Sequence, residues 1–158
     1  MVKPHSGEAD EQGIKDDVVA DADASESDSF ILKLDADGNF IWVKTVASEL
    51  SNFAFALDVA NDGTIRVGGV FQEVVDFDFG PEVFELTSEG SADVYMLKLT
   101  TDGDFVWAKA VGNELYDRCI DVAIDDDGNS YFVGVFEGEI DSELGDRYRF
   151  FCSQSQEL

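Results

Sequence analysis

The chain contains one sequence unit twice, and the two copies lie 65 residues apart. Residues 28–90 align without a gap on residues 93–155, and 20 of the 63 aligned pairs are identical. The identical pairs include turn glycines and both tryptophans: Gly38/Gly103, Gly63/Gly128 and Trp42/Trp107. Chance similarity does not keep such residues in register over this distance. We therefore predict two copies of one supersecondary unit, and hence a repeat architecture.

Each unit has the pattern of two β-hairpins. In residues 30–46, apolar side chains alternate with period two on both sides of Asp37-Gly38, and Asp-Gly between two such runs is a strong hairpin signal. Residues 53–60 and 64–71 form the second pair of runs, and Gly68-Gly69 in this pair indicates a bulge or a close backbone approach. Short extended pieces follow in residues 74–86. About four strands in about 65 residues match one blade of a β-propeller.

The units resemble a known family, the bacterial seven-bladed β-propeller repeats called SBBP. The resemblance is carried by residues 121–136 (DVAIDDDGNSYFVGVF), by residues 75–90 (VDFDFGPEVFELTSEG) and by the D-G-[ND]-F-[IV]-W-x-K hairpins at 37–44 and 102–109. It runs from Asp28 onward, with a departure from the pattern at 141–153. It implies a propeller fold and a secreted or cell-surface protein of bacterial type. It supplies no catalytic residue, because the family is defined by its scaffold.

The expected fold class is all-β, with propeller-type repeats of four-stranded antiparallel blades. If the Asp-Val-Ala strand is the innermost of each blade, as the resemblance implies, residues 29–52 supply the outer hairpin of a first blade, 53–117 a complete blade, and 118–158 the inner hairpin of a further blade with a degenerate end. One complete blade and two half blades amount to about two blades. The chain therefore forms an incomplete ring, because closed propellers have about four to eight blades. Three solutions stay open: a piece of a longer propeller, a head-to-tail homo-oligomer, or an open monomer.

Charge limits the classes of partner. The chain has 35 acidic and 10 basic residues, a formal net charge of -25, and 44% hydrophobic residues. Such a surface repels phosphate backbones and anionic lipids, so we expect no nucleic-acid partner and no membrane insertion. The sequence shows no apolar run long enough for a transmembrane helix and no signal peptide. A protein or carbohydrate ligand is the expected partner.

Residues 1–28 are acidic and contain no aromatic side chain, so we predict a disordered leader. His5, the single histidine, lies in it, which argues against a histidine-dependent triad or zinc site in the folded body. Cys119 and Cys152 form no metal-binding spacing, and their pairing is left open.

The Asp-rich turns invite a calcium interpretation, but they lack the ligand spacing of an EF-hand. Asp76 and Asp78 beside Gly80, with Asp141 as the repeat counterpart of Asp76, are the candidate calcium ligands. Otherwise no cofactor is expected. Solvated hairpin turns are the simpler interpretation of the remaining carboxylates.

We expect a non-enzymatic scaffold or binding module. No nucleophile, phosphate-loop or dinucleotide motif is present. The alternatives are a glycoside hydrolase or lyase that uses acidic residues, and a calcium-stabilised structural repeat. Trp42 and Trp107 alternate in step with Phe40 and Phe105, so they are expected to pack between neighbouring blades rather than stack on sugars.

Overall fold

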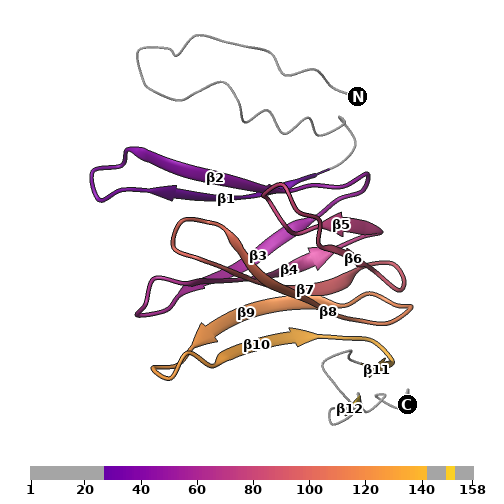
Figure 1. The fold of residues 1–158 in the computed structure, drawn as a ribbon. Coiled ribbons are helices and arrows are strands. Elements are labelled where there is room, and N and C mark those ends of the chain that lie inside the picture. Colours follow the sequence, from indigo (N-terminus) through magenta and orange to yellow (C-terminus); the bar gives the residue numbers. More distant parts are fainter. Residues whose placement is uncertain (1–26, 142–148, 152–158) are drawn as a thin grey trace.

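The computed structural model describes residues 27–141 and 149–151, and all regular structure in these ranges is β-strand. The strands are β1 Ser29–Leu34, β2 Phe40–Val46, β3 Phe53–Val59, β4 Ile65–Phe71, β5 Val74–Asp76, β6 Glu85–Thr87, β7 Asp93–Leu99, β8 Phe105–Val111, β9 Arg118–Ile124, β10 Ser130–Val135, β11 Glu139–Asp141 and β12 Arg149–Phe151. Figure 1 shows them as stacked layers that follow one another in chain order. The predicted all-β fold class is confirmed.

The middle layer is a four-stranded antiparallel sheet in the order β3-β4-β7-β8. In its register, Val67 of β4 lies opposite Leu57 of β3 and Leu97 of β7. This sheet is a complete propeller-type blade. The hairpins β1–β2 and β9–β10 form the layers on either side, each as a two-stranded sheet (Figure 1). The half, full and half arrangement is therefore present, and the described strands form no closed ring.

Two small ribbons complete the described structure. Between β4 and β7, the strands β5 and β6 pair through Val75 and Leu86, so the predicted extended pieces form a ribbon of their own. After β10, the strands β11 and β12 pair through Ile140 and Phe150. No helix in the described part of the chain is long and apolar enough to cross a membrane.

The turns of the four long hairpins, β1–β2, β3–β4, β7–β8 and β9–β10, share one five-residue design, at 35–39, 60–64, 100–104 and 125–129. In each, the first amide donates to the fifth carbonyl, and the amide of the fourth residue donates to the first carbonyl. The fourth residue is always a glycine, with φ between 81° and 86°. A side chain at this backbone conformation is strained. The repeat glycines Gly38, Gly63, Gly103 and Gly128 are thus explained by turn geometry.

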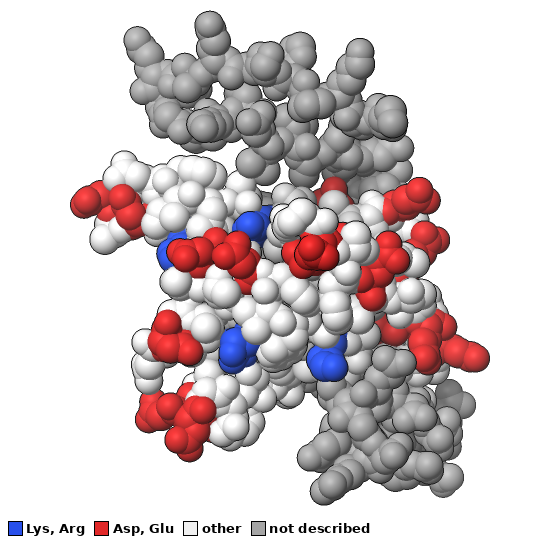
Figure 2. Space-filling model, viewed as in Figure 1, with Lys and Arg blue, Asp and Glu red and all other residues white. Residues whose placement is uncertain are grey.

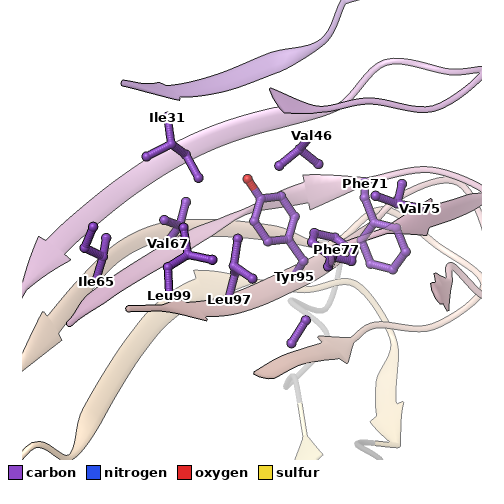
Figure 3. Packing of buried hydrophobic residues seen from close by; sticks show 11 residues of the cluster. Ile31, Val46, Ile65, Val67, Phe71, Val75, Phe77, Tyr95, Leu97 and Leu99 are labelled. Carbon is purple, nitrogen blue, oxygen red and sulfur yellow. The ribbon is translucent and has the colours of Figure 1, made fainter. Parts of the chain in front are cut away.

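The main core lies between β1–β2 and the central sheet. Figure 3 shows Tyr95, Leu97 and Leu99 of β7 on the same side of the sheet as Ile31 and Val46. All five side chains are buried. The Phe71 and Phe77 rings extend this cluster, with centroids 6.5 and 5.0 Å from that of Tyr95. Burial of a side chain of this size stabilises the fold by about 1.5–3 kcal/mol.

The adjacent glycines of β4 allow close approach on both faces of the central sheet. Gly69 lies opposite Tyr95, and a Cβ on Gly69 would stand 2.5 Å from that ring. Gly68 faces the other way, where a Cβ would stand 2.5 Å from Cys119 Sγ. The predicted close approach is therefore found at both positions, while the bulge lies in the facing strand between Ala54 and Ala56.

The second packing surface joins the central sheet to β9–β10. Strand β9 packs across β3 and β4. Polar contacts fix the alignment: the amide of Ile124 donates to Asp58 Oδ2 over 2.8 Å, and Arg66 Nε donates to Ser130 Oγ over 2.7 Å. Residues about one repeat apart in the sequence come together here.

Several predictions fall outside the described residues. Residues 1–26 of the predicted leader are among them, whereas Ser27 accepts a hydrogen bond from the amide of Asn52. Cys152 also lies outside. Within the described ranges, Cys119 is buried and forms no disulfide.

Candidate interaction surfaces

The antiparallel strand order gathers the four five-residue turns at one end of the stacked sheets, which we call the turn end. It consists of residues 35–39, 60–64, 100–104 and 125–129, and these carry Asp side chains but no Lys or Arg. Figure 2 shows acidic side chains along the corresponding edge of the molecule and also along the opposite edge. Loops 47–52 and 112–117, and the residues of loop 72–92 next to β4 and β7, lie at the opposite end, because the strands between them run back. The tip of loop 72–92 folds back along β8, where the Phe84 ring lies 4.8 Å from that of Phe105. The acidic turns thus form one continuous surface.

Contacts within and between the turns hold this surface in shape. Asp35 Oδ1 accepts the amides of Asp37 and Asn39, and Asp125 Oδ1 accepts the equivalent pair in the last turn. Hydrogen bonds, first of all from the Asn39 side chain, hold the pKa of Asp35 below its usual value. Between turns, Asn61 Nδ2 donates to Asp126 Oδ1 over 3.1 Å.

Trp42 and Lys33 connect the first hairpin to the turn of the central blade. Lys33 Nζ donates to the carbonyl of Thr101 over 2.6 Å, and Trp42 Nε1 donates to the same carbonyl over 3.3 Å. The Trp42 ring covers Gly103. It therefore lies between two blades. Trp107 lies one repeat on, with the Arg66 guanidinium 5.7 Å from its ring centroid.

The candidate calcium ligands Asp76 and Asp78 lie in the loop between β5 and β6. Asp76 Oδ1 accepts the amides of Asp78 and Phe84, and Asp78 Oδ1 accepts the amide of Gly80. These hydrogen bonds hold the backbone of the loop in its turn conformation. Asp141 belongs to a different ribbon: it lies in β11, where its backbone is opposite that of Arg149 in β12. Within the described ranges, no group of three or more acidic, Cys or His side chains is arranged to hold a metal.

Two buried carboxylates were not found by sequence analysis. Asp93 and Asp117 are almost inaccessible to solvent, and burial raises the pKa of both. Asp117 accepts the amide of Asn113, and Asp93 that of Glu89. Asp93 lines a hollow of about 410 Å³ beside β6 and Gly112. Asp93 has the same residue type as its repeat counterpart Asp28, and this identity was the signal in the sequence that marked the position.

The first strand exposes apolar side chains whose repeat counterparts are fully buried. Phe30, Leu32 and Leu34 of β1 are 66%, 46% and 47% exposed. Their counterparts in β7 are Tyr95, Leu97 and Leu99, each 0% exposed. Because the residue types match, the difference in exposure arises from the layer that covers each strand. The β1–β2 hairpin covers β7, whereas no described residue covers β1 in this way.

The same contrast appears along the inner strands. Leu57 of β3 is 51% exposed, but its counterpart Val122 in β9 is 7% exposed, because β9 packs on the central sheet. At the far end, Tyr131, Val133 and Val135 of β10 are also exposed. The stack therefore has an apolar face at each end.

Comparison with known proteins agrees with the blade geometry. The chain is similar to an uncharacterized WD repeat-containing protein of Acanthamoeba polyphaga mimivirus, with 25% identity over 111 residues. The match covers 68% of the chain but 8% of that relative, so the chain spans less than a tenth of the relative's length. WD repeats form four-stranded propeller blades. No family model matches the chain.

Proposed function

We propose that the chain is a non-enzymatic section of a β-propeller that serves as a scaffold and binding module for a protein partner. The turn end is the observation that carries this proposal. Four turns of one design lie side by side there, and their own side chains and those of neighbouring blades brace them. Such a surface is available for recognition while the sheets behind it remain packed.

The charge of the surface indicates the chemistry of the partner. The chain has a formal net charge of -25, and the turns contain acidic but no basic side chains. Complementary charge speeds the encounter of two proteins and disfavours partners of like sign. We therefore propose a partner with a basic surface. A bacterial secreted or cell-surface location, as in SBBP-type repeats, belongs to the same proposal through the resemblance of the hairpin motifs.

The binding test compares the removal of negative charge from the turn end with its removal from the loops at the opposite end of the strands. Asp37, Asp102 and Asp127 are exposed turn residues, so Asp→Asn at all three removes charge from the turn end and leaves the turn hydrogen bonds in place. The matched control replaces Glu49, Glu73 and Glu114, exposed loop residues at the other end, by Gln. The probe is a poly-lysine peptide, and its affinity is measured by titration calorimetry at low and physiological salt.

We expect the turn-end variant to weaken poly-lysine binding about tenfold or more, and the control variant to weaken it much less. Equal losses in the two variants would overturn the turn end as the binding surface, because they would show that only total charge matters. A poly-glutamate peptide should not bind to any of the three proteins.

A panel of soluble carbohydrates tests the non-enzymatic part of the proposal. We expect no turnover. Turnover that disappears in both the Asp76→Asn and Asp141→Asn variants would overturn it in favour of a hydrolase or lyase. Carbohydrate binding without turnover, combined with no poly-lysine binding, would replace the protein partner by a carbohydrate.

A further inference from the structure

An open apolar cavity of about 440 Å³ lies between the central sheet and the last hairpin. Met96 and Val111 line it from β7 and β8, and Phe132, Val133 and Val135 line it from β10. It borders the edge of β10 that faces away from β9. No described strand pairs with that edge, because β10 pairs with β9 alone.

The equivalent space one repeat earlier is filled. Subtracting 65 from Met96, Val111 and Phe132 gives Ile31, Val46 and Val67, which belong to the main core. There, β7 pairs along β4 and inserts Tyr95, Leu97 and Leu99 into the space. The cavity is thus the second copy of a packing site whose occupant is an antiparallel hairpin with an aromatic residue and two leucines on one face.

The chain carries such a hairpin at its other end. In β1–β2, the residues at the positions of Tyr95, Leu97 and Leu99 are Phe30, Leu32 and Leu34, and all three are exposed. The edge of β1 that faces away from β2 is also without a described partner strand. Exposed apolar sheet faces and unpaired edges are the features that natural proteins cover by association.

We propose that copies of this chain associate head to tail, with β1–β2 of one copy inserted into the cavity of the next and β1 paired along β10. The register follows from that of β4 and β7, where Val67 lies opposite Leu97 and Gly69 opposite Tyr95. Leu32 of one copy then lies opposite Phe132 of the other, and Phe30 lies opposite Gly134. Gly134 provides room for the Phe30 ring as Gly69 does for Tyr95.

Each such junction completes one blade from two halves. A ring of n copies then contains 2n blades, and the usual range of about four to eight blades corresponds to about two to four copies. The net charge of -25 on each copy opposes this association, so added salt should strengthen it.

The first test is mass in solution, measured by sedimentation at several protein concentrations in about 0.5 M salt, where charge repulsion is screened. We expect the mass to rise with concentration above the 17.3 kDa of a single copy. Leu32→Asp should abolish the rise. Because Leu32 is exposed in the single chain, this variant should keep the melting midpoint of dilute wild-type protein. A wild-type mass of one copy at every concentration would overturn the proposal.

The second test fixes the register by disulfide trapping. Leu32→Cys protein is mixed with Phe132→Cys protein, both in a background with Cys119 and Cys152 replaced by Ser, and is oxidised. We expect a mixed dimer joined through positions 32 and 132. The control partner is Tyr131→Cys, whose side chain points to the other face of the sheet. Equal trapping with both partners would overturn the predicted register. Trapping with Tyr131→Cys alone would overturn the predicted orientation of the hairpin, because it would place Leu32 on the outer face of the completed sheet rather than in the cavity.

Discussion

Asp93 is a carboxylate with almost no solvent contact in a protein that already carries excess negative charge. Its Oδ2 accepts the amide of Glu89 over 2.9 Å, while its Oδ1 has no hydrogen-bond partner among the described residues. Burial is the main cause of its raised pKa, and the nearby charges of Asp117 and Glu89 act in the same direction. The folded chain therefore holds this proton more tightly than the unfolded chain does, and ionised Asp93 destabilises the fold at neutral pH.

Asp93→Asn should consequently stabilise the protein at pH 7, by on the order of 1 kcal/mol. The amide keeps an oxygen for the Glu89 amide and removes the buried charge. As the pH falls through the raised pKa of Asp93 toward the ordinary value of 3.8, wild-type Asp93 becomes neutral and the advantage of the variant should shrink. Urea unfolding at pH 7 and pH 4 measures both effects.

The control for Asp93→Asn is Asp102→Asn, which removes the same charge from an exposed turn. We expect it to change the free energy of unfolding by no more than about 0.5 kcal/mol. A lower urea midpoint for Asp93→Asn at pH 7 would show that the buried carboxylate stabilises the fold, contrary to this account.

At the scale of the strand, the repeat provides matched pairs of residues that differ only in what covers them. Leu97 and Leu32 occupy equivalent positions in β7 and β1, yet Leu97 is fully buried under the first hairpin and Leu32 is exposed. Leu97→Ala should reduce the free energy of unfolding by about 2–5 kcal/mol, because it leaves a cavity in the core. Leu32→Ala should cost about 0.5 kcal/mol or less in dilute protein.

Urea unfolding at low micromolar protein gives both values for this leucine pair. Equal costs would mean that β1 is covered in solution even when the chain is dilute. That result would contradict the exposed first strand of the structure.

The β5–β6 loop allows a direct test of calcium. Its carboxylates accept loop amides, and the structure brings Asp141 to a different ribbon. We therefore expect the melting midpoint to be the same in equal concentrations of calcium and magnesium, and to fall equally when a chelator removes either ion. A calcium-specific increase that disappears in Asp78→Asn would contradict this and would establish the calcium-stabilised repeat instead.

The elements that depend on local sequence could be predicted, and those that depend on neighbours could not. Alternating residues and Asp-Gly turns predicted the hairpins, and the 65-residue shift predicted that β9–β10 repeats β3–β4. The five-residue turn with Asp35 bound to its own backbone was missed, because its hydrogen bonds depend on loop conformation. The recurrence of Asp28 as Asp93 marked that position but not its burial, and the exposure of Leu32 was not predicted either, since each depends on how a separate layer of the stack packs.

At the scale of the whole molecule, self-repulsion should dominate the response to salt. With a formal net charge of -25, compaction brings like charges together. Raising the salt concentration from about 0.02 to about 0.5 M screens this repulsion, so the melting midpoint of dilute protein should rise. The variant with Asp37, Asp102 and Asp127 replaced by Asn should show a smaller rise. A midpoint that is independent of salt would contradict the expectation.

The hydrogen bond between Asn61 and Asp126 joins two residues that occupy the same position in successive copies. Any residue at this position therefore faces its own counterpart in the next blade. In an array of identical units, aspartate there would place carboxylate against carboxylate at every junction, whereas asparagine can both donate and accept. A consensus design based on this unit should therefore keep asparagine at this position, although aspartate is frequent in the surrounding turns.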